Sequence, residues 1–447
     1  MATNDTRLLQ LAHFATMTRW SAHGSAFGNV KSRFPLVPLS AILRRIKEPI
    51  SIEDGVLYKR ITVRNNGRGV VQRDELHGRE IGTKRQFVAH AGQFIISRID
   101  ARNGAFGIVP KELEGAVVTN DFWLFEVQKA LPEYLMLVLS SKRFQQYWQN
   151  QSSGTTNRQR VSENDFLQSE IMLPPIKDQK TIIAQYNNKM RLAGVANKDV
   201  AEHFLALNKH ISDVLRISYN SSKVSRLLVH ISFQWLSRWD PGYLTSRIIV
   251  SSKYPMVPLS KVIRNFLVDR DGKSLRRSIK DDGKRIYQYI GMEQIEKNIG
   301  KRETKIVMGT EILSQTISVP RDYVLYGKLR PYLNKYWENT TCEDNIVCSS
   351  EFFVFDTTDV ERKYFLAVLS SSMIQRQLPP LYRGTRMPRI AEEDFLRLQI
   401  PLPPKDVQKA IAFHYDKTLK TIDRLQNKAK EICQRARQEF ESTIFGG

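Results

Sequence analysis

Two stretches of sequence decide the fold of this chain: LPPIKDQK at residues 173–180 and LPPKDVQK at residues 402–409. Proline lacks a backbone N–H, so a proline pair is poorly suited to a helix interior but well suited to the residues just before a helix. Each stretch is followed by apolar residues three and four positions apart, the spacing of one helix face. The two stretches therefore predict two long helices that start in the same way.

The repetition extends outward from these stretches. VPLS at residues 37–40 returns at residues 257–260, and Asp165-Phe166 returns as Asp394-Phe395. The spacing between partners is roughly 220–230 residues, far longer than the ~20–50 residues of a solenoid unit. The sequence therefore predicts one large unit that occurs twice.

Short β-branched runs and scattered glycines between the repeated motifs predict strands and turns. We expect an α+β fold with two similar globular domains, each a mixed, mainly antiparallel sheet with helices. The domains are separated by two long helices that pair as an antiparallel coiled coil, which gives an internal pseudo-twofold repeat. A single helix is expected at residues 131–148 and again at 360–378. The predicted boundaries are 1–175 and 220–404 for the globular domains, and 176–219 and 405–447 for the helices.

Each long helix carries a seam of apolar or aromatic residues over about four heptads, the pattern of a coiled coil. One polar residue interrupts each seam, Asn197 in the first helix and Gln426 in the second. A polar seam residue disfavours shifted registers, because there it would face an apolar side chain. We therefore interpret Asn197 and Gln426 as fixing the coiled-coil register. The alternative is chance placement at a solvent-facing layer.

The charge of the chain indicates its class of partner. Its 447 residues include 68 Lys and Arg against 46 Asp and Glu, a formal charge of +22. Both halves share the excess: 23 against 16 in residues 1–175, and 29 against 20 in residues 220–404. Such charge attracts nucleic-acid backbones, so two basic nucleic-acid surfaces are favoured over a merely soluble basic protein. With only three cysteines, no visible secretion signal and no long apolar run, a cytoplasmic location is predicted.

No catalytic or cofactor signature accompanies these features. The GKS at residues 272–274 lacks the first glycine of a phosphate-binding loop, because residue 267 is leucine, and neither HExxH nor GxSxG occurs. We therefore predict a non-catalytic binding protein with no metal site, and assign any chemistry to a partner. An enzyme with an unfamiliar site is the alternative.

The first candidate contact with DNA is a predicted strand end that carries closely spaced cations and an asparagine. Cations suit phosphate oxygens, and Arg and Asn also form bidentate hydrogen bonds with purine edges. A buried turn whose cations pair with Asp100 or Asp121 is the structural alternative. The candidate residues are Arg98, Arg102 and Asn103 in the first half, and Lys328, Arg330 and Asn334 in the second.

The second candidate is a Gly-Thr loop that occurs once in each half. Such a loop offers backbone N–H, hydroxyl and guanidinium donors together, which is typical of a phosphate contact. A loop that packs the globular part onto the coiled coil is the alternative, and the basic pair Arg276-Arg277 is interpreted as a solvated face. The candidate residues are Thr155, Arg158 and Arg160, and then Arg383, Thr385, Arg386 and Arg389.

With these motifs in place, the chain resembles the DNA-specificity subunit of type I restriction-modification systems. The resemblance rests on the two stretches at residues 173–180 and 402–409 and on the Gly-Thr loops, and it covers almost the whole chain. The family usually has Glu before the glutamine, whereas this chain has Asp178 and Val407. That difference concerns the packing of the helix start.

The resemblance implies two target-recognition domains that read an asymmetric, bipartite site in double-stranded DNA, with the helices as a ruler and docking surface. It implies two adenine-methyltransferase (modification) subunits and motor-nuclease (restriction) subunits as partners in phage defence. S-adenosylmethionine, ATP and Mg²⁺ are expected on those subunits, and no cofactor on this chain. The alternatives are a specificity subunit of another methylation-based defence system, or a non-specific nucleic-acid-binding coiled-coil scaffold.

Overall fold

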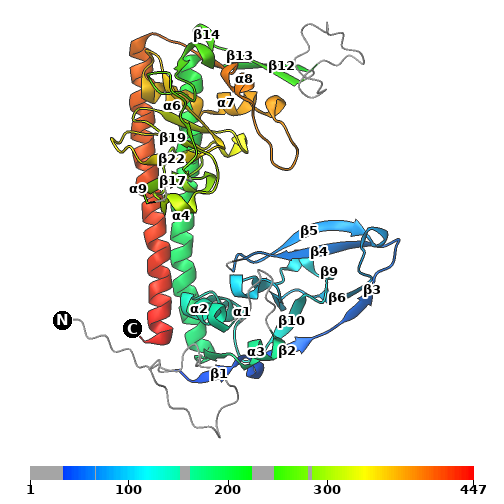
Figure 1. The fold of residues 1–447 in the computed structure, drawn as a ribbon. Helices are drawn as coiled ribbons and strands as arrows, with labels where there is room; N and C mark the ends of the chain where they lie inside the picture. The colour runs from blue at the N-terminus through cyan, green and yellow to red at the C-terminus, as the bar shows by residue number, and fades with distance from the viewer. Residues whose placement is uncertain (1–33, 66, 152–161, 224–245, 280–283, 447) are drawn as a thin grey trace, which may run out of the picture. The chain divides into compact units, whose positions relative to one another are not determined.

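The computed structural model describes residues 34–65, 67–151, 162–223, 246–279 and 284–446 (Figure 1). The chain forms two compact units. Unit 1 comprises Met1–Val195 and Lys428–Gly447, and unit 2 comprises Ala196–Asn427. The division falls within both long helices, so each unit owns a sheet-rich part and a portion of each helix. None of the described helices combines the length and the apolar composition that crossing a bilayer requires.

Unit 1 contains three sheets, with strand orders β1-β11, β2-β10-β7-β8 and β3-β6-β9-β4-β5. All neighbours pair antiparallel except β4 and β9, which are parallel. The strands are β1 (Leu36–Pro38), β2 (Leu43–Ile46), β3 (Pro49–Ser51), β4 (Leu57–Val63), β5 (Val70–His77), β6 (Arg85–Ala89), β7 (Phe94–Ser97), β8 (Phe106–Ile108), β9 (Ala116–Val118), β10 (Phe122–Val127) and β11 (Glu170–Met172).

Unit 2 repeats this topology with strand orders β14-β24, β15-β23-β20-β21 and β16-β19-β22-β17-β18, and it adds the hairpin β12-β13. The parallel pair is again at the equivalent place, β17 with β22. The strands are β12 (Ser218–Lys223), β13 (Ser246–Ser251), β14 (Met256–Pro258), β15 (Ile263–Arg264), β16 (Arg276–Arg277), β17 (Ile286–Ile290), β18 (Ile306–Met308), β19 (Thr316–Ser318), β20 (Val324–Gly327), β21 (Tyr336–Glu338), β22 (Ile346–Ser349), β23 (Phe352–Thr357) and β24 (Gln399–Pro401).

The helices also occur in equivalent pairs. The expected single helix is wrong in both halves, because α1 and α2 are separate helices, as are α6 and α7. The Ser141 hydroxyl donates to the Val138 carbonyl at 2.7 Å and accepts the Phe144 N–H at 3.3 Å, which ends one helix and starts the next. The helices are α1 (Pro132–Leu139), α2 (Lys142–Gln151), α3 (Glu163–Gln168), α4 (Ile176–Leu215), α6 (Arg362–Leu369), α7 (Ser372–Gln377), α8 (Glu392–Leu396) and α9 (Lys405–Phe445). The predicted α+β fold with two similar, mainly antiparallel sheet-rich domains is confirmed.

The repeated motifs are the parts that join the sheets to the long helices. Each VPLS element lies beside the strand that leads into the LPP stretch, because β1 pairs with β11 and β14 pairs with β24. Leu39 and Leu259, the leucines of the two VPLS elements, are completely buried. Their N–H groups donate to the carbonyls of Ser169 and Leu398, both at 2.9 Å. The repeat therefore forms a scaffold around each core.

The glutamine of each LPP stretch is buried and makes the same two hydrogen bonds in both units. The Gln179 amide accepts the Leu131 N–H at 2.8 Å and donates to the Pro174 carbonyl at 2.8 Å. In unit 2, the Gln408 amide accepts the Glu361 N–H and donates to the Pro403 carbonyl, again at 2.8 Å each. Each glutamine thus ties the start of a long helix to the start of α1 or α6, and pairs backbone groups that would otherwise be buried without partners.

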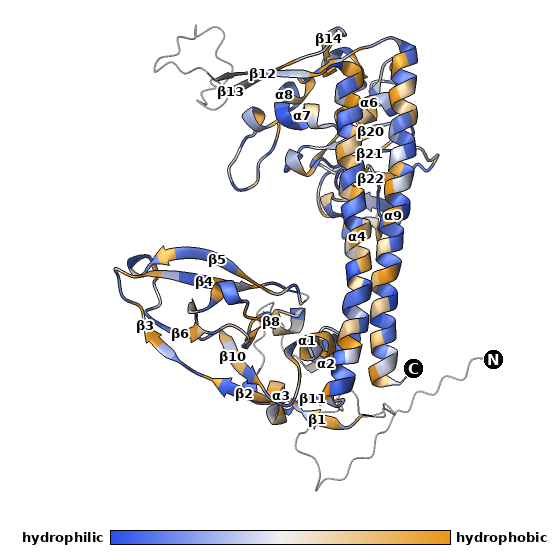
Figure 2. Ribbon diagram, turned by 180° about the vertical axis from the view of Figure 1, so that it is seen from behind, coloured by the Kyte–Doolittle hydropathy of each residue, from blue (hydrophilic) through white to orange (hydrophobic). Residues whose placement is uncertain are grey.

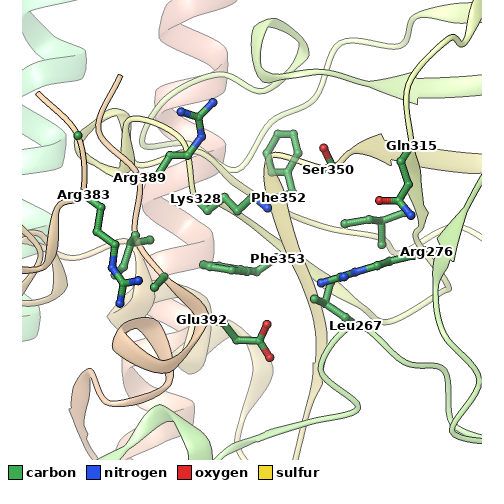
Figure 3. A pocket seen from close by; sticks show the side chains of 14 residues that line it. Leu267, Arg276, Gln315, Lys328, Ser350, Phe352, Phe353, Arg383, Arg389 and Glu392 are labelled. Carbon is green, nitrogen blue, oxygen red and sulfur yellow. The ribbon is translucent and has the colours of Figure 1, made fainter. Parts of the chain in front are cut away.

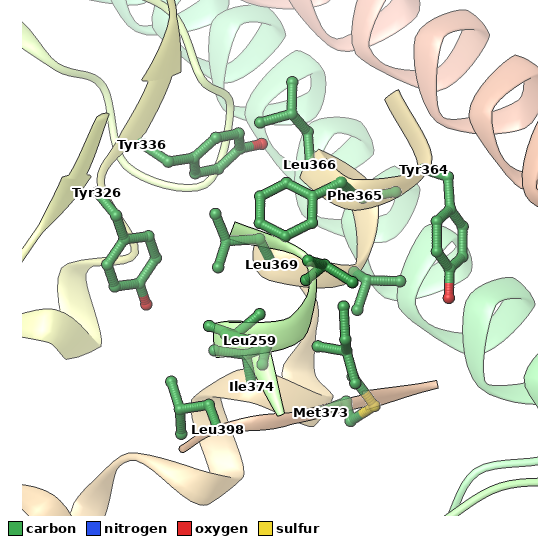
Figure 4. Packing of buried hydrophobic residues seen from close by; sticks show 14 of the residues in the cluster. Leu259, Tyr326, Tyr336, Tyr364, Phe365, Leu366, Leu369, Met373, Ile374 and Leu398 are labelled. Atoms are coloured by element: carbon green, nitrogen blue, oxygen red, sulfur yellow. The ribbon is translucent and has the colours of Figure 1, made fainter. Parts of the chain in front are cut away.

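The repeated Asp-Phe pair supplies an aromatic residue to each core. Phe166 is buried and its ring stacks on Phe94 of β7 with an interplanar angle of 3°. Phe395 is equally buried and stacks on Tyr326 of β20 and Phe353 of β23, with ring centroids 5.1 and 4.9 Å apart. Figure 4 shows part of the unit 2 core, in which Tyr326 and side chains of α6 and α7 converge. Burial of such a side chain contributes about 1.5–3 kcal/mol.

Both long helices carry hydrophobic and hydrophilic residues in alternation (Figure 2). In unit 1, Tyr186 of α4 meets Phe440 of α9, with ring centroids 6.3 Å apart. In unit 2, Val200 of α4 and Ile422 of α9 are buried in one cluster. Further along unit 2, His210 of α4 stacks on His414 of α9, so residue numbers rise along one helix as they fall along the other and the helices run antiparallel.

The structure corrects the interpretation of one register residue. Asn197 is exposed, and its neighbour Ala196 is the buried residue of that turn. The prediction that Asn197 lies in the seam is therefore wrong, because the buried stripe passes from Ala193 through Ala196 to Val200. Gln426 is half-buried, and its Oε1 atom is buried without a hydrogen-bond partner among the described residues.

The two glutamines of α9 generate a matched test of the scaffold. We expect Gln408→Met to lower the free energy of unfolding of unit 2, because the Glu361 N–H and the Pro403 carbonyl lose their partners at about 1–3 kcal/mol each. We expect Gln426→Met to leave stability unchanged or raise it, since its buried oxygen has no partner to lose. Thermal unfolding of both variants measures the difference. Equal effects of the two substitutions would contradict this role for Gln408.

A second test concerns two histidines of unit 2, one on each long helix. The rings of His210 and His414 stack with centroids 3.9 Å apart. Burial lowers the pKa of His414, and the charges of His210 and Lys417 lower it further. As the pH falls through about 6.5, the unfolded chain therefore binds a proton before the folded chain does, and stability falls. We expect the loss of melting temperature between about pH 7.5 and pH 5.5 to be smaller in His414→Gln.

His203→Gln, on α4 outside the stacked pair, is the control. A loss of melting temperature in His414→Gln that equals the wild-type loss would rule out this contribution.

Candidate nucleic-acid interface

Unit 2 contains a hollow of about 690 Å³ at the place where β20 ends and β23 begins (Figure 3). Four cations lie along it, while Glu392 is its one acidic lining residue among the described parts of the chain. A concave surface with this excess of positive charge suits a polyanion. The lining residues are Leu267, Arg276, Gln315, Ile317, Lys328, Ser350, Phe352, Phe353, Arg383, Gly384, Arg389, Ile390, Ala391 and Glu392.

The second Gly-Thr loop forms one side of the hollow. Its ends are joined, because Arg383 and Arg389 exchange backbone hydrogen bonds of 2.8 and 2.9 Å. Gly384 has a φ of +84°, in the left-handed region that glycine adopts without the strain a side chain would cause. The loop is therefore a tight hairpin that holds the arginines at its two ends, Arg383 and Arg389, in fixed positions.

The arginines at the two ends of this hairpin, Arg383 and Arg389, are held by carboxylates. Arg389 is bidentate to Glu351, with Nη2–Oε1 at 2.8 Å and Nε–Oε2 at 3.1 Å, and this pairing raises the pKa of Arg389. Arg383 Nη2 donates to Oδ2 of Asp394 at 2.9 Å, and Asp394 is buried at the first turn of α8. The acidic residue of the repeated Asp-Phe pair thus anchors the loop.

Lys328 follows the central strand β20 directly. Its equivalent in unit 1 is Arg98, because Gly327 pairs with Phe352 in unit 2 as Ser97 pairs with Phe122 in unit 1. No hydrogen bond or ion pair occupies the Lys328 ammonium group among the described residues. Sequence reasoning assigned Lys328 to one candidate DNA contact and Arg383 and Arg389 to another, and the fold brings these three residues to the same hollow.

Asn334 does not belong to a DNA-contacting surface, so that prediction is wrong. Its side chain is 3% exposed, and its Nδ2 donates to Asn298 Oδ1 at 3.0 Å and to the Ser370 carbonyl at 2.7 Å. The residue has a φ of +48°, which asparagine tolerates better than most side chains. Asn334 therefore fastens the turn after β20 to the end of α6.

The remaining unit 2 candidates lie outside the lining of the hollow. Arg330 is exposed, and its Nη2 contacts the Met387 sulfur at 3.1 Å. Thr385 and Arg386 are exposed at the tip of the hairpin. These three residues stay candidates for contacts with DNA outside the hollow.

In unit 1 the cationic turn is only partly available. The Arg98 guanidinium lies over the Trp123 ring at 5.5 Å, and Nη1 contacts the Asn120 carbonyl at 3.5 Å. Asn103 is exposed and donates to Asp100 at 3.2 Å. The Arg102 side chain and the loop residues Thr155, Arg158 and Arg160 lie outside the described residues.

Two lining residues were missed by sequence reasoning. Arg276, on β16, was visible as one of a basic pair but was interpreted as a solvated face. Gln315, just before β19, carried no signal, since a single glutamine in a loop has no pattern. Figure 3 shows Arg276 reaching into the hollow from the side opposite to Arg383 and Arg389.

The corrected role of Asn334 gives a stability prediction. We expect Asn334→Ala to lower the free energy of unfolding of unit 2 by about 1–3 kcal/mol, because the buried Ser370 carbonyl loses its donor. Asn103→Ala, at the exposed turn of unit 1, should change stability by less than about 0.5 kcal/mol. Thermal unfolding measures both. An Asn334→Ala protein with wild-type stability would contradict the structural role.

Comparisons with known proteins agree with this architecture. A family model described as "Type I restriction modification DNA specificity domain" matches residues 45–186 and 265–434. The type I restriction enzyme MjaVIII specificity subunit of Methanocaldococcus jannaschii is 22% identical over 332 residues, which covers 72% of each chain.

Solved structures were also found. The HsdS subunit from Thermoanaerobacter tengcongensis has 16% identity and a TM-score of 0.38, with 94% of this chain and 99% of that chain covered. The type I restriction-modification S subunit from M. genitalium has 10% identity and a TM-score of 0.41, with 94% and 98% covered.

The family match spans most of the chain and falls on the sheets of both units, with the same strand orders and the same buried glutamines in each. This chain therefore belongs to the family of type I restriction-modification specificity subunits and carries the DNA specificity domain of that family twice.

Proposed function

We propose that this chain is the sequence-reading subunit of a type I restriction-modification complex and that each unit binds one part of a split DNA target. The observation that carries the proposal is the family match, which occurs once on each of two units with the same topology. The cation-lined hollow of unit 2 supports it, because phosphate contacts by Lys and Arg position a protein on DNA.

The two halves of the target should differ. At the equivalent position after the central strand, unit 1 has Arg98 over Trp123, whereas unit 2 has Lys328 beside Phe353. The hairpin β4-β5 has strands of 7 and 8 residues, whereas β17 and β18 have 5 and 3. Different side chains on one scaffold contact different bases, so the proposed target is asymmetric.

The chemistry is assigned to partners in this proposal. Adenine methylation is placed on two modification subunits and cleavage on motor-nuclease subunits, which would bring S-adenosylmethionine, ATP and Mg²⁺. This chain contributes recognition and no catalytic residue, and it acts in the cytoplasm, where the complex meets incoming phage DNA. The MjaVIII relative, named as a specificity subunit of a restriction enzyme, supports this division of labour.

Replacement of one domain tests the proposal. The chain is co-expressed with a modification subunit of its system, and methylated adenines are mapped across the host genome. We expect a bipartite, asymmetric motif. Exchange of residues 1–175 for those of another family member should alter one half of the motif and leave the other half unchanged, because each unit reads separately.

Methylation without a sequence motif, or a change in both halves after the exchange, would contradict the proposal. Binding of the complex to DNA that does not depend on sequence would favour a scaffold function instead. Expression of the unexchanged chain alone, without the modification subunit, is the control for background methylation.

A further inference from the structure

The cations around the unit 2 hollow differ in how fully their donors are already used. The Nε and Nη2 groups of Arg389 both donate to Glu351. These two groups form one of the edges of the guanidinium with which an arginine binds a guanine. The Nη2 group of Arg383 donates to the buried Asp394. Either arginine would have to break an ion pair before that edge could read a base.

Arg276 is placed differently. It lies on β16, the edge strand of its sheet, in register with the buried Ile317 of β19. The residue is exposed, and no carboxylate or carbonyl holds its guanidinium among the described residues. Its whole fork of donors therefore faces the hollow, as Figure 3 shows.

Gln315 lies beside Arg276 on the same side of the hollow. It is exposed just before β19, and its amide has no hydrogen-bond partner within the described part of the chain. An amide offers one acceptor and one donor side by side, the pattern that matches the N6 and N7 atoms of adenine. Gln315 directly precedes β19, the strand that pairs with β16, so both side chains come from the same edge of the five-stranded sheet.

We propose that Arg276 and Gln315 are the base-reading residues of unit 2. Arg276 reads a guanine, Gln315 reads an adenine, and Lys328, at the end of β20, holds a backbone phosphate. The inference rests on the proposed function and deepens it, because it assigns specificity to a side of the hollow formed by β16 and β19. The paired arginines Arg383 and Arg389 keep that hollow in shape.

The hydrogen-bond chemistry explains this division. Arginine and glutamine form bidentate contacts that distinguish one base pair from another, whereas a lysine is a point charge that suits phosphate irrespective of sequence. Loss of a bidentate reader lowers discrimination at one base pair on the order of 10- to 100-fold. Loss of a phosphate contact weakens binding to all sequences and reduces the slope of log K against log salt by about 1.

The test uses the full chain in complex with its modification subunit. Methylated sites are mapped, and binding to the mapped site and to single-base variants is measured at several salt concentrations. We expect Arg276→Ala to accept other base pairs at one guanine position in one half of the motif, and Gln315→Ala to do so at one adenine position. Lys328→Ala should keep the motif and lower the salt slope.

Arg277→Ala is the matched control, because Arg277 is the adjacent exposed arginine of β16 and its side chain is not among those that line the hollow. It should keep the motif and change affinity uniformly. Arg276→Gln is a second variant that preserves a polar side chain, and it should also lose the guanine preference. Melting temperatures confirm that the variants are folded.

Failure of the proposed function and failure of each residue assignment give different results. A wild-type complex without any motif would overturn the proposed function itself. A wild-type motif that persists unchanged in both Arg276→Ala and Arg276→Gln would overturn the assignment of Arg276 alone, and unchanged specificity in Gln315→Ala would overturn that of Gln315. A uniform loss of affinity in Arg276→Ala with the motif intact would make Arg276 a phosphate contact.

Discussion

The architecture depends on one interaction that occurs twice, the buried amide of Gln179 and of Gln408. Each amide accepts an N–H at the start of α1 or α6 and donates to a proline carbonyl at the start of a long helix. A helix start leaves N–H groups without intrahelical partners, and such groups are costly to bury unpaired. One side chain meets both requirements, so the sheet-rich part and the long helix of each unit are joined at a defined place.

The interface builds on this scaffold through ion pairs. Asp394 is fixed in the core by its neighbour Phe395, and it holds Arg383, while Glu351 holds Arg389. Such pairs lower the cost of bringing several cations together around one hollow, because each positive charge is partly compensated. Among the described residues, the side-chain donors of Lys328 and Arg276 have no hydrogen-bond or ion-pair partner, so they have capacity for a new one. Charge alone does not distinguish Arg276 from the paired arginines Arg383 and Arg389. Their hydrogen bonds to carboxylates do.

Much of the fold follows from local patterns. The LPP stretches predicted the starts of α4 and α9, and the repeat predicted two similar α+β units. Helix starts and buried strands have characteristic residue patterns over short segments, so they are visible in the sequence. The failures were also physical. The helix expected at residues 131–148 is broken at Ser141, whose hydroxyl competes for backbone hydrogen bonds. Asn334 was predicted to contact DNA together with its cationic neighbours. The backbone conformation of the turn instead directs its side chain into the core.

By itself, the sequence determined the fold class, the duplication, the positions of the long helices and the family, since these depend on the order and periodicity of residues. Only the tertiary structure decided that Ala196 rather than Asn197 is buried, because adjacent residues of a helix differ by only a fraction of a turn. Only the tertiary structure brought Arg276, Gln315 and Lys328 to one hollow with the hairpin of Arg383 and Arg389. These residues come from separate strands and a loop. Strand pairing between distant parts of the chain brings them together, and the local sequence does not specify that pairing.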